Sequence, residues 1–148
     1  MMARLEIDLP EDLLSELLSA DFGEIAAEAL SEAAPILEQS LKTSCRRAID
    51  HEGESEMVDS ITCGKPKKTK TDAWILNVGP RGYSRKKYYR GSHGRRYPVS
   101  NALKMIWKEY GIAGRQAPRP FITNARNNAR GAVIRKMQEV YERKVGAR

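Results

Sequence analysis

A long helical pattern covers residues 21–50 and limits what this chain can fold into more than any other feature. Its apolar side chains recur at spacings of three and four residues, as on the buried stripe of an amphipathic helix. Pro35 interrupts the pattern, lacks a backbone donor and is expected to bend the helix. The stripe consists of Phe22, Ile25, Ala26, Ala29, Ala33, Ile36, Leu37, Leu41, Ala48 and Ile49.

A second helical pattern begins at Phe121 and runs to about residue 144. Gly131 lies inside it and weakens the helix by roughly 1 kcal/mol relative to Ala. The side chains expected to point inward are Ile122, Ala125, Ala129, Val133, Met137 and Val140.

The segments around these two helices carry shorter patterns. Residues 3–9 alternate apolar and polar side chains, which predicts a half-buried strand, and Pro10 suits the start of a short helix. Residues 51–60 are typical of a linker with a turn at Gly53. Residues 99–110 have helical spacing, although a strand at the Glu-Tyr-Gly end is also open.

The middle of the chain predicts strands and basic loops. The stretches SITCG and DAWILNVG indicate two strands, joined by the basic loop KPKKTKT. Residues 79–98 are rich in Gly, Arg, Lys and Tyr, and a loop of this length is usually functional or disordered. We therefore expect one α+β domain over residues 1–148, with a basic loop insertion at about 79–98. In it, an antiparallel sheet of about four strands packs against the long N-terminal-half helix and the C-terminal helix.

Charge divides the chain into two unlike halves. Residues 1–59 hold fifteen acids and four bases, a net charge of −11, and residues 60–148 hold four acids and twenty-two bases, a net charge of +18. Such a chain can pair its halves internally, pair with copies of itself, or bind a polyanion through the basic half.

The residues typical of catalysis or metal binding are sparse. Asp72 and Glu109 are the only acids between residues 60 and 138, and no pair suited to acid/base chemistry is evident. The soft metal ligands lack the close cysteine pair that zinc modules use: Cys45, His51, Cys63 and His93. We expect a protein without enzymatic activity, metal or cofactor.

The chain carries no sign of a membrane or secretory segment. Its longest apolar runs are only a few residues, and its acidic N-terminus is unlike a signal peptide. We expect synthesis in a cytoplasm, where both cysteines would stay reduced.

Lysines, arginines and tyrosines gather in the two basic segments. Cations neutralise phosphates and tyrosines stack on bases, so this composition fits a nucleic-acid surface. The same segments could instead dock on an acidic protein surface, such as the N-terminal half of a neighbouring copy, or simply be solvated. The candidate DNA-facing residues are Lys65, Lys67, Lys68, Lys70, Arg85, Lys86, Lys87 and Arg90.

Two stripes of like charge suggest a contact between copies. Glu24, Glu28 and Glu32 recur every four residues, and Arg119, Arg126 and Arg130 lie close to one face near the start of the last helix. Like charges so placed disfavour an isolated helix, and an opposite surface across an interface would turn the penalty into a gain. The alternative is that each stripe is a hydrated helix face.

Several short motifs, in order, resemble the tailed-bacteriophage neck family, which comprises tail-completion, head–tail joining and other minor tail proteins. Ser60-Ile61 matches a strand start in that family, and Glu109-Tyr110-Gly111 matches its Glu-aromatic-Gly segment. Pro120-Phe121, with Ala125, matches the entry to the last helix.

The resemblance implies a structural virion protein, made in the host cytoplasm, that forms a homo-oligomeric ring of six copies at the head–tail junction. Its expected partners are the head connector or stopper and the tail tube, with non-specific contact to genomic DNA in the ring lumen. Glu109, Tyr110, Gly111, Pro120 and Phe121 join the two charged stripes as expected interface residues, although Phe121 also fits a core position. The rival function is that of a small basic nucleic-acid-binding protein that uses the Lys/Arg/Tyr loops.

Overall fold

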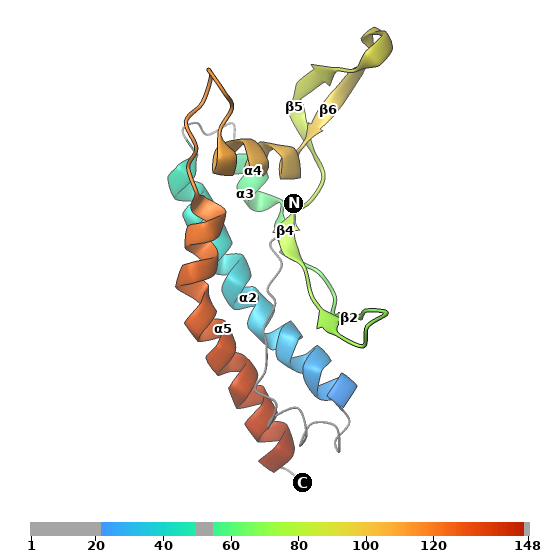
Figure 1. Ribbon diagram of the computed structural model, residues 1–148, viewed down its shortest axis with the longest axis vertical. Coiled ribbons are helices and arrows are strands. Elements are labelled where there is room, and N and C mark those ends of the chain that lie inside the picture. The colour runs from blue at the N-terminus through green and yellow to red at the C-terminus, as the bar shows by residue number, and fades with distance from the viewer. Residues whose placement is uncertain (1–21, 50–54, 147–148) are drawn as a thin grey trace.

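The computed structural model of the protein describes residues 22–49 and 55–146 (Figure 1). It contains both helices and strands, which confirms the expected α+β class. The strand predicted over residues 3–9, the short helix from Pro10 and the turn at Gly53 all lie outside the described residues.

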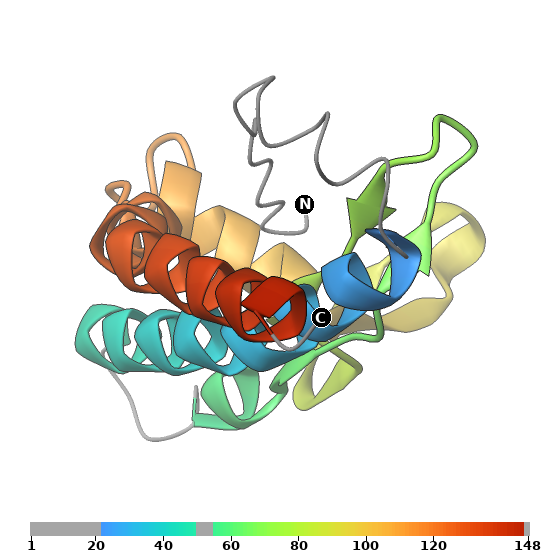
Figure 2. The same cartoon turned by 90° about the horizontal axis from the view of Figure 1, so that it is seen from below.

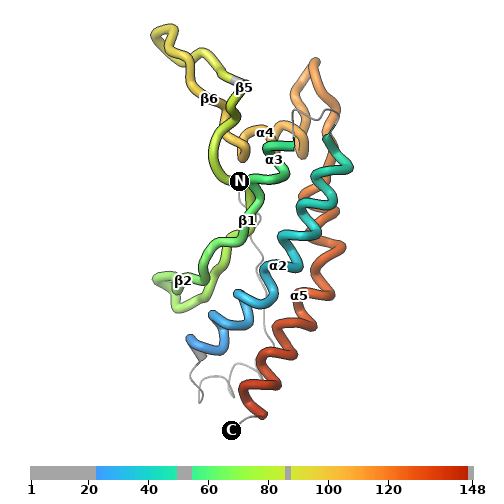
Figure 3. Tube along the Cα trace, turned by 180° about the vertical axis from the view of Figure 1, so that it is seen from behind, coloured from blue at the N-terminus to red at the C-terminus, as the bar shows by residue number. Residues whose placement is uncertain are grey.

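Two long helices form the body of the protein. Helices α2 (Phe22–Ala48) and α5 (Phe121–Gly146) lie side by side and run in opposite directions (Figures 1 and 3). Their apolar stripes face each other, and both stripes expected from the sequence contribute to the core. Helix α2 continues past Pro35, whose side chain is exposed. The fully buried centre of the core is formed by Leu41, Cys45, Met57, Val58, Ile61, Val78 and Val133.

A first β-hairpin lies beside α2. Strand β1 (Ile61–Cys63) pairs with β4 (Val78–Pro80), and β2 (Lys67–Lys68) pairs with β3 (Trp74–Ile75), both in antiparallel register. The Gly64 N–H donates to the Asn77 carbonyl at 2.7 Å between the two ladders, and Pro66 follows without a backbone donor. The predicted hairpin is therefore present, with its ladder divided into two parts.

A second hairpin replaces the loop predicted over residues 79–98. Strand β5 (Tyr83–Arg90) pairs with β6 (Arg96–Ser100) through a short 3-10 turn at Ser92–Gly94. This hairpin, residues 83–100, projects beyond the helices and is called the arm below (Figures 1 and 3). Within the described residues, the strands thus form three two-stranded ladders rather than one sheet of about four strands. Gly82, at a φ of 75°, redirects the chain between the two hairpins.

Two shorter helices close one end of the body. Helix α3 (Ser55–Asp59) occupies part of the predicted linker because Met57 and Val58 are drawn into the core. Helix α4 (Asn101–Tyr110) lies across the end of the α2–α5 pair, as Figures 1 and 2 show from two directions. The Ser100 hydroxyl caps α4 by accepting the Leu103 N–H at 3.1 Å. The Glu-Tyr end is therefore helical, not a strand.

Candidate functional site

The corner between α4 and α5 holds five of the motif residues, and Glu109 is the one that caps a helix. Glu109 is only 5% exposed, and its carboxylate accepts the backbone N–H groups of Ile122 at 2.7 Å and Thr123 at 3.3 Å. It also accepts the Thr123 hydroxyl at 2.7 Å. A carboxylate at these unpaired N–H groups caps α5 and matches the positive end of the helix dipole. Glu109 is therefore a structural cap inside one chain.

Arg119 caps the end of α2, as Glu109 caps the start of α5. Its Nη1 donates to the Ala48 carbonyl at 2.9 Å, and its backbone N–H donates to the Lys108 carbonyl at 2.7 Å. A guanidinium at this carbonyl caps the negative end of α2. The corner thus ties the end of α2 and the start of α5 to α4.

Gly111 makes the corner possible. Its φ of 76° and ψ of 178° lie in a region that only glycine enters at little cost. A Cβ there would lie 2.6 Å from the Gln116 carbonyl oxygen and 2.8 Å from the Pro118 nitrogen. Phe121 is 4% exposed and packs in the core, the second of the two roles considered for it. Among the corner residues proposed for a subunit contact, Tyr110 and Pro120 are exposed.

The acidic stripe of α2 finds basic partners within its own chain. Arg143 Nη2 lies 2.9 Å from Glu28 Oε1 and 2.6 Å from Glu32 Oε1. Lys144 Nζ lies 2.7 Å from Glu28 Oε2, and Lys136 Nζ lies 3.8 Å from Glu32 Oε2. Antiparallel packing places the start of α2 beside the end of α5, and Arg143 and Lys144 in the last turn of α5 also match the dipole of that helix. The charge of Glu28 and Glu32 is therefore balanced without a second copy.

The proposed basic counterpart of that stripe lies at the other end of α5. Arg126 and Arg130 are exposed, and neither forms an ion pair with another residue in the described part of the chain. Arg119 is occupied at the end of α2. Within one chain the structure does not bring the glutamates and these arginines together, and Glu24 is exposed near the start of α2.

The cations that pair with Glu28 lower the pKa of its carboxyl group. The hydrogen bond from Lys144 is the largest cause that lowers the pKa of Glu28 below its ordinary value of 4.5, and Arg143 adds to the effect. A carboxyl group with a lowered folded-state pKa stabilises the fold above its unfolded pKa. That contribution is lost as the pH falls through the folded-state pKa.

We therefore expect Glu28→Gln to lower the melting temperature near neutral pH and at low salt. The difference from the parent protein should shrink as the pH falls below 4.5, because the parent then loses the same charge. Melting followed by circular dichroism between neutral and acidic pH measures this. Glu142→Gln is the matched control, since Glu142 is exposed, accepts a hydrogen bond from Gln138 and forms no ion pair within the described residues. A difference that stays constant with pH would contradict the assignment.

Glu38 joins the first hairpin to α2. Its Oε2 accepts the Cys63 thiol at 2.8 Å and the Cys63 N–H at 3.2 Å, while Oε1 accepts Lys42 Nζ at 2.8 Å. The Cys63 hydrogen bond is the main cause that lowers the pKa of Glu38. Burial, and then Glu38, raise the pKa of the Cys63 thiol to about 12. Cys63 is thus a protonated donor at neutral pH rather than a nucleophile.

The arm presents aromatic and basic side chains away from the body. Tyr88, Tyr89 and Tyr97 are 48%, 49% and 40% exposed. The rings of Tyr89 and Tyr97 stack with centroids 5.6 Å apart, and the Arg96 guanidinium lies 5.1 Å from the Tyr88 ring centroid. These are large aromatic surfaces for a protein of this size to leave uncovered.

The base of the arm is fixed to α4. Asn101, 2% exposed, donates from Nδ2 to the Arg81 carbonyl at 2.8 Å, and its N–H donates to the Gly82 carbonyl at 3.0 Å. Val99 and Ser84 are buried at the same end. The arm is therefore anchored at its base and exposed beyond it.

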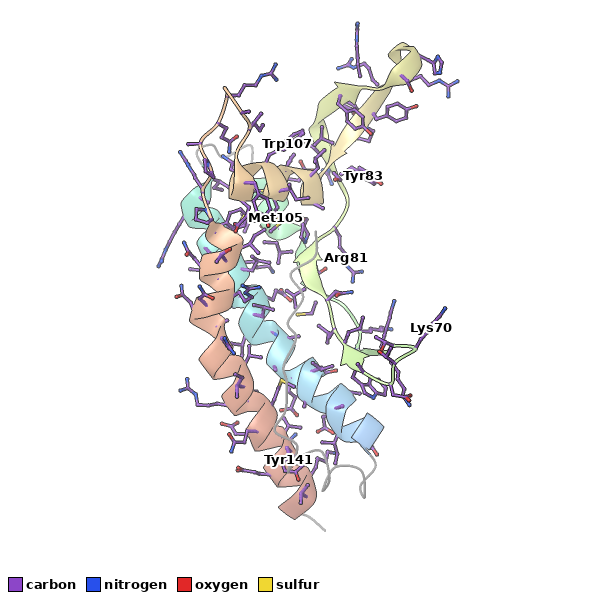
Figure 4. All side chains as sticks on the ribbon, viewed as in Figure 1. Lys70, Arg81, Tyr83, Met105, Trp107 and Tyr141 are labelled. Carbon is purple, nitrogen blue, oxygen red and sulfur yellow. The ribbon has the colours of Figure 1, made fainter. Side chains whose placement is uncertain are left out.

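The candidate DNA-facing residues divide between two hairpins. Lys65, Lys67, Lys68 and Lys70 are exposed around the tip of the first hairpin, where Lys68 Nζ lies 2.9 Å from an Asp72 carboxylate oxygen. Arg85 and Arg90 are exposed on β5, which also carries Lys86 and Lys87. Figure 4 places Lys70 at the first tip and Tyr83 at the base of the arm, well apart along the molecule. The structure does not bring the two sets together.

Sequence patterns missed the residues that position these features. The basic partners Lys136, Arg143 and Lys144 were not singled out, nor was Asn101, which fixes the base of the arm. Arg96 and Tyr97 were part of a segment expected to be a loop. Helix-dipole matching could have indicated Arg143 and Lys144, whereas Asn101 left no sequence signal. Within residues 22–49 and 55–146, no group of His, Cys, Asp and Glu could hold a metal ion. None of the helices in those ranges is long and apolar enough to cross a membrane.

Comparison of the chain with protein-family models, with curated proteins and with solved structures gives no match.

Proposed function

We propose that this chain is a structural virion protein of a tailed bacteriophage. Copies of it form a ring at the head–tail junction that completes or terminates the tail and joins it to the head connector. The observation that carries the proposal is the arm, an anchored β-hairpin whose tyrosines the body of the protein leaves exposed. A two-stranded hairpin is at best marginally stable alone in water, so a partner surface that covers the arm would stabilise it.

The positions of the family-like motifs support the same reading. Ile61 begins β1, Gly111 ends α4 and Phe121 begins α5. Each motif lies at a boundary between two secondary-structure elements. The hydrogen bonds of Glu109 and Arg119 stabilise the boundaries at the end of α4 and the start of α5. A rigid body with one projecting arm suits head-to-tail assembly, in which two different surfaces of each copy meet.

In this proposal the neighbours of the ring are the head connector or stopper on one side and the tail tube on the other. The internal balance of Glu28 and Glu32 shifts the expected contact away from the acidic stripe and toward the exposed arm. Tyr110, Pro120, Arg126 and Arg130, which are all exposed, stay candidate interface residues.

Light scattering of the purified protein, combined with negative-stain images, tests the proposal. We expect a mass of several copies and closed rings at high protein concentration. A protein that stays monomeric at every concentration, and also fails to assemble when mixed with purified connectors, would contradict it.

A second function, that of a free-standing nucleic-acid-binding protein, is favoured by the contact of Arg96 with Tyr88. It predicts a monomer that binds DNA and forms no rings, so the same light-scattering measurement separates the two functions.

A further inference from the structure

The two faces of the arm carry different chemistry. Tyr89 lies directly across the ladder from Tyr97, so both project from one face. Arg90 lies directly across from Arg96, and Tyr88 lies across from Pro98, so these four share the opposite face. One face therefore presents stacked rings and the other presents a pair of cations beside a ring.

The cation pair is unbalanced. Like charges directly across an antiparallel ladder destabilise it. Residues 81–97 contain seven lysines and arginines and no acid. Neither Arg90 nor Arg96 forms an ion pair with another described residue, and Arg96 instead stacks on Tyr88. An anion held between the two guanidinium groups would turn this repulsion into a gain.

The rings of the tyrosine face pack closely against the arm and against each other. Gly91 lies beneath the Tyr97 ring, where a Cβ would come within 2.5 Å of that ring. The stack of Tyr97 on Tyr89 further restrains both side chains. Flat rings that are held in place and about half exposed are suited to stacking on bases.

The described body lacks an evident acidic surface to receive the arm of another copy. Among the described acids along α2 and in the first hairpin, all except the exposed Glu24 already contact lysine or arginine within the chain: Glu28, Glu32, Glu38 and Asp72. A polyanion that also offers flat rings matches both faces of the arm better than a carboxylate surface does.

We propose that the arm binds the phosphodiester backbone of a nucleic acid, with Arg90 and Arg96 holding phosphate on one face. Tyr89 and Tyr97 stack on bases wherever these are unpaired. The inference deepens the DNA contact of the proposed function and depends on that function only for the source of the nucleic acid. DNA binding by the arm can be tested whether or not the chain forms rings.

Fluorescence anisotropy with labelled duplex DNA and labelled single-stranded DNA of equal length, across a series of salt concentrations, tests the proposal. Each phosphate contact contributes about 0.9 to the slope of log affinity against log salt for a duplex. The double variant Arg90→Ser/Arg96→Ser should therefore bind more weakly, with a slope shallower by about 2. The control variant Arg46→Ser/Arg135→Ser removes the same charge from exposed positions on α2 and α5 and should leave the slope unchanged.

Tyr89→Leu is expected to affect binding of single-stranded and duplex DNA differently. It should weaken single-strand binding by roughly tenfold, because stacking on an aromatic ring is a large part of such binding, and should leave duplex binding unchanged. Circular dichroism of each variant verifies that the fold persists.

Three results would overturn the proposal. The first is no binding of either DNA at low salt. The second is an equal loss in the arm variant and in the Arg46→Ser/Arg135→Ser control, which would reduce the effect to overall charge. The third is equally tight, arm-dependent binding of polyglutamate, which would identify an acidic protein surface as the occupant.

Discussion

Gly111→Ala is expected to lower the free energy of unfolding by about 3 kcal/mol, combining backbone strain with overpacking. The strain arises because alanine adopts a φ of 76° only at a cost in free energy. The overpacking arises because the new Cβ would meet backbone atoms of Gln116 and Pro118 that cannot rotate away. Urea unfolding measures the change as a lower midpoint at constant slope.

Gly114→Ala is the control for the Gly111 substitution. Gly114 has a φ of 71°, but no atom lies within 4 Å of its Cβ position. It should therefore cost only the strain, about 1 kcal/mol. Equal losses for the two variants would show that the close approach at Gly111 contributes nothing.

Glu109→Ala should destabilise the protein by about 2–3 kcal/mol, since it leaves donors at the start of α5 unpaired. The carboxylate satisfies two backbone N–H groups and the Thr123 hydroxyl, and no neighbouring acid replaces it within the described corner. Urea unfolding again gives the free energy, and far-ultraviolet circular dichroism shows whether the start of α5 frays.

Two further variants are controls for Glu109→Ala: the conservative change Glu109→Gln and the surface change Glu142→Ala. Glutamine retains one acceptor oxygen and should recover part of the loss, whereas exposed Glu142 should change stability by less than about 0.5 kcal/mol. If Glu109→Ala cost no more than Glu142→Ala, the capping role of Glu109 would be wrong.

The helical body could be predicted from the sequence because helical periodicity is local. The buried positions of α2 and α5 follow spacings of three and four residues, and nothing distant is needed to recognise them. The first hairpin was predicted from its short apolar runs. The spacing did not predict that the ladder is interrupted between Cys63 and Lys67, a stretch that contains Pro66 and its missing donor.

The arm could not be predicted because its strands lack alternation between apolar and polar residues. Tyrosine lies on both faces and arginine on one of them, so neither face is apolar and the two-residue period that marks a half-buried strand is absent. The residues that anchor the arm, Asn101 above all, act through contacts between elements that sequence spacing does not reveal.

The acidic stripe shows a different limit. Spacing alone matched Glu24, Glu28 and Glu32 with arginines near the start of α5, on a separate copy. Antiparallel packing instead brings the end of α5 to the glutamates, where Arg143 and Lys144 bind them. Which basic cluster pairs with an acidic one is decided by the direction of the helices. Complementary spacing cannot determine that direction.

Hydrogen–deuterium exchange, measured with and without DNA and at low and high protein concentration, tests most directly whether the arm is the surface that meets partners. We expect slower amide exchange in residues 83–100 when DNA or further copies are present, and unchanged exchange along residues 24–32 of α2. Slower exchange confined to residues 24–32, with the arm unaffected, would contradict the account.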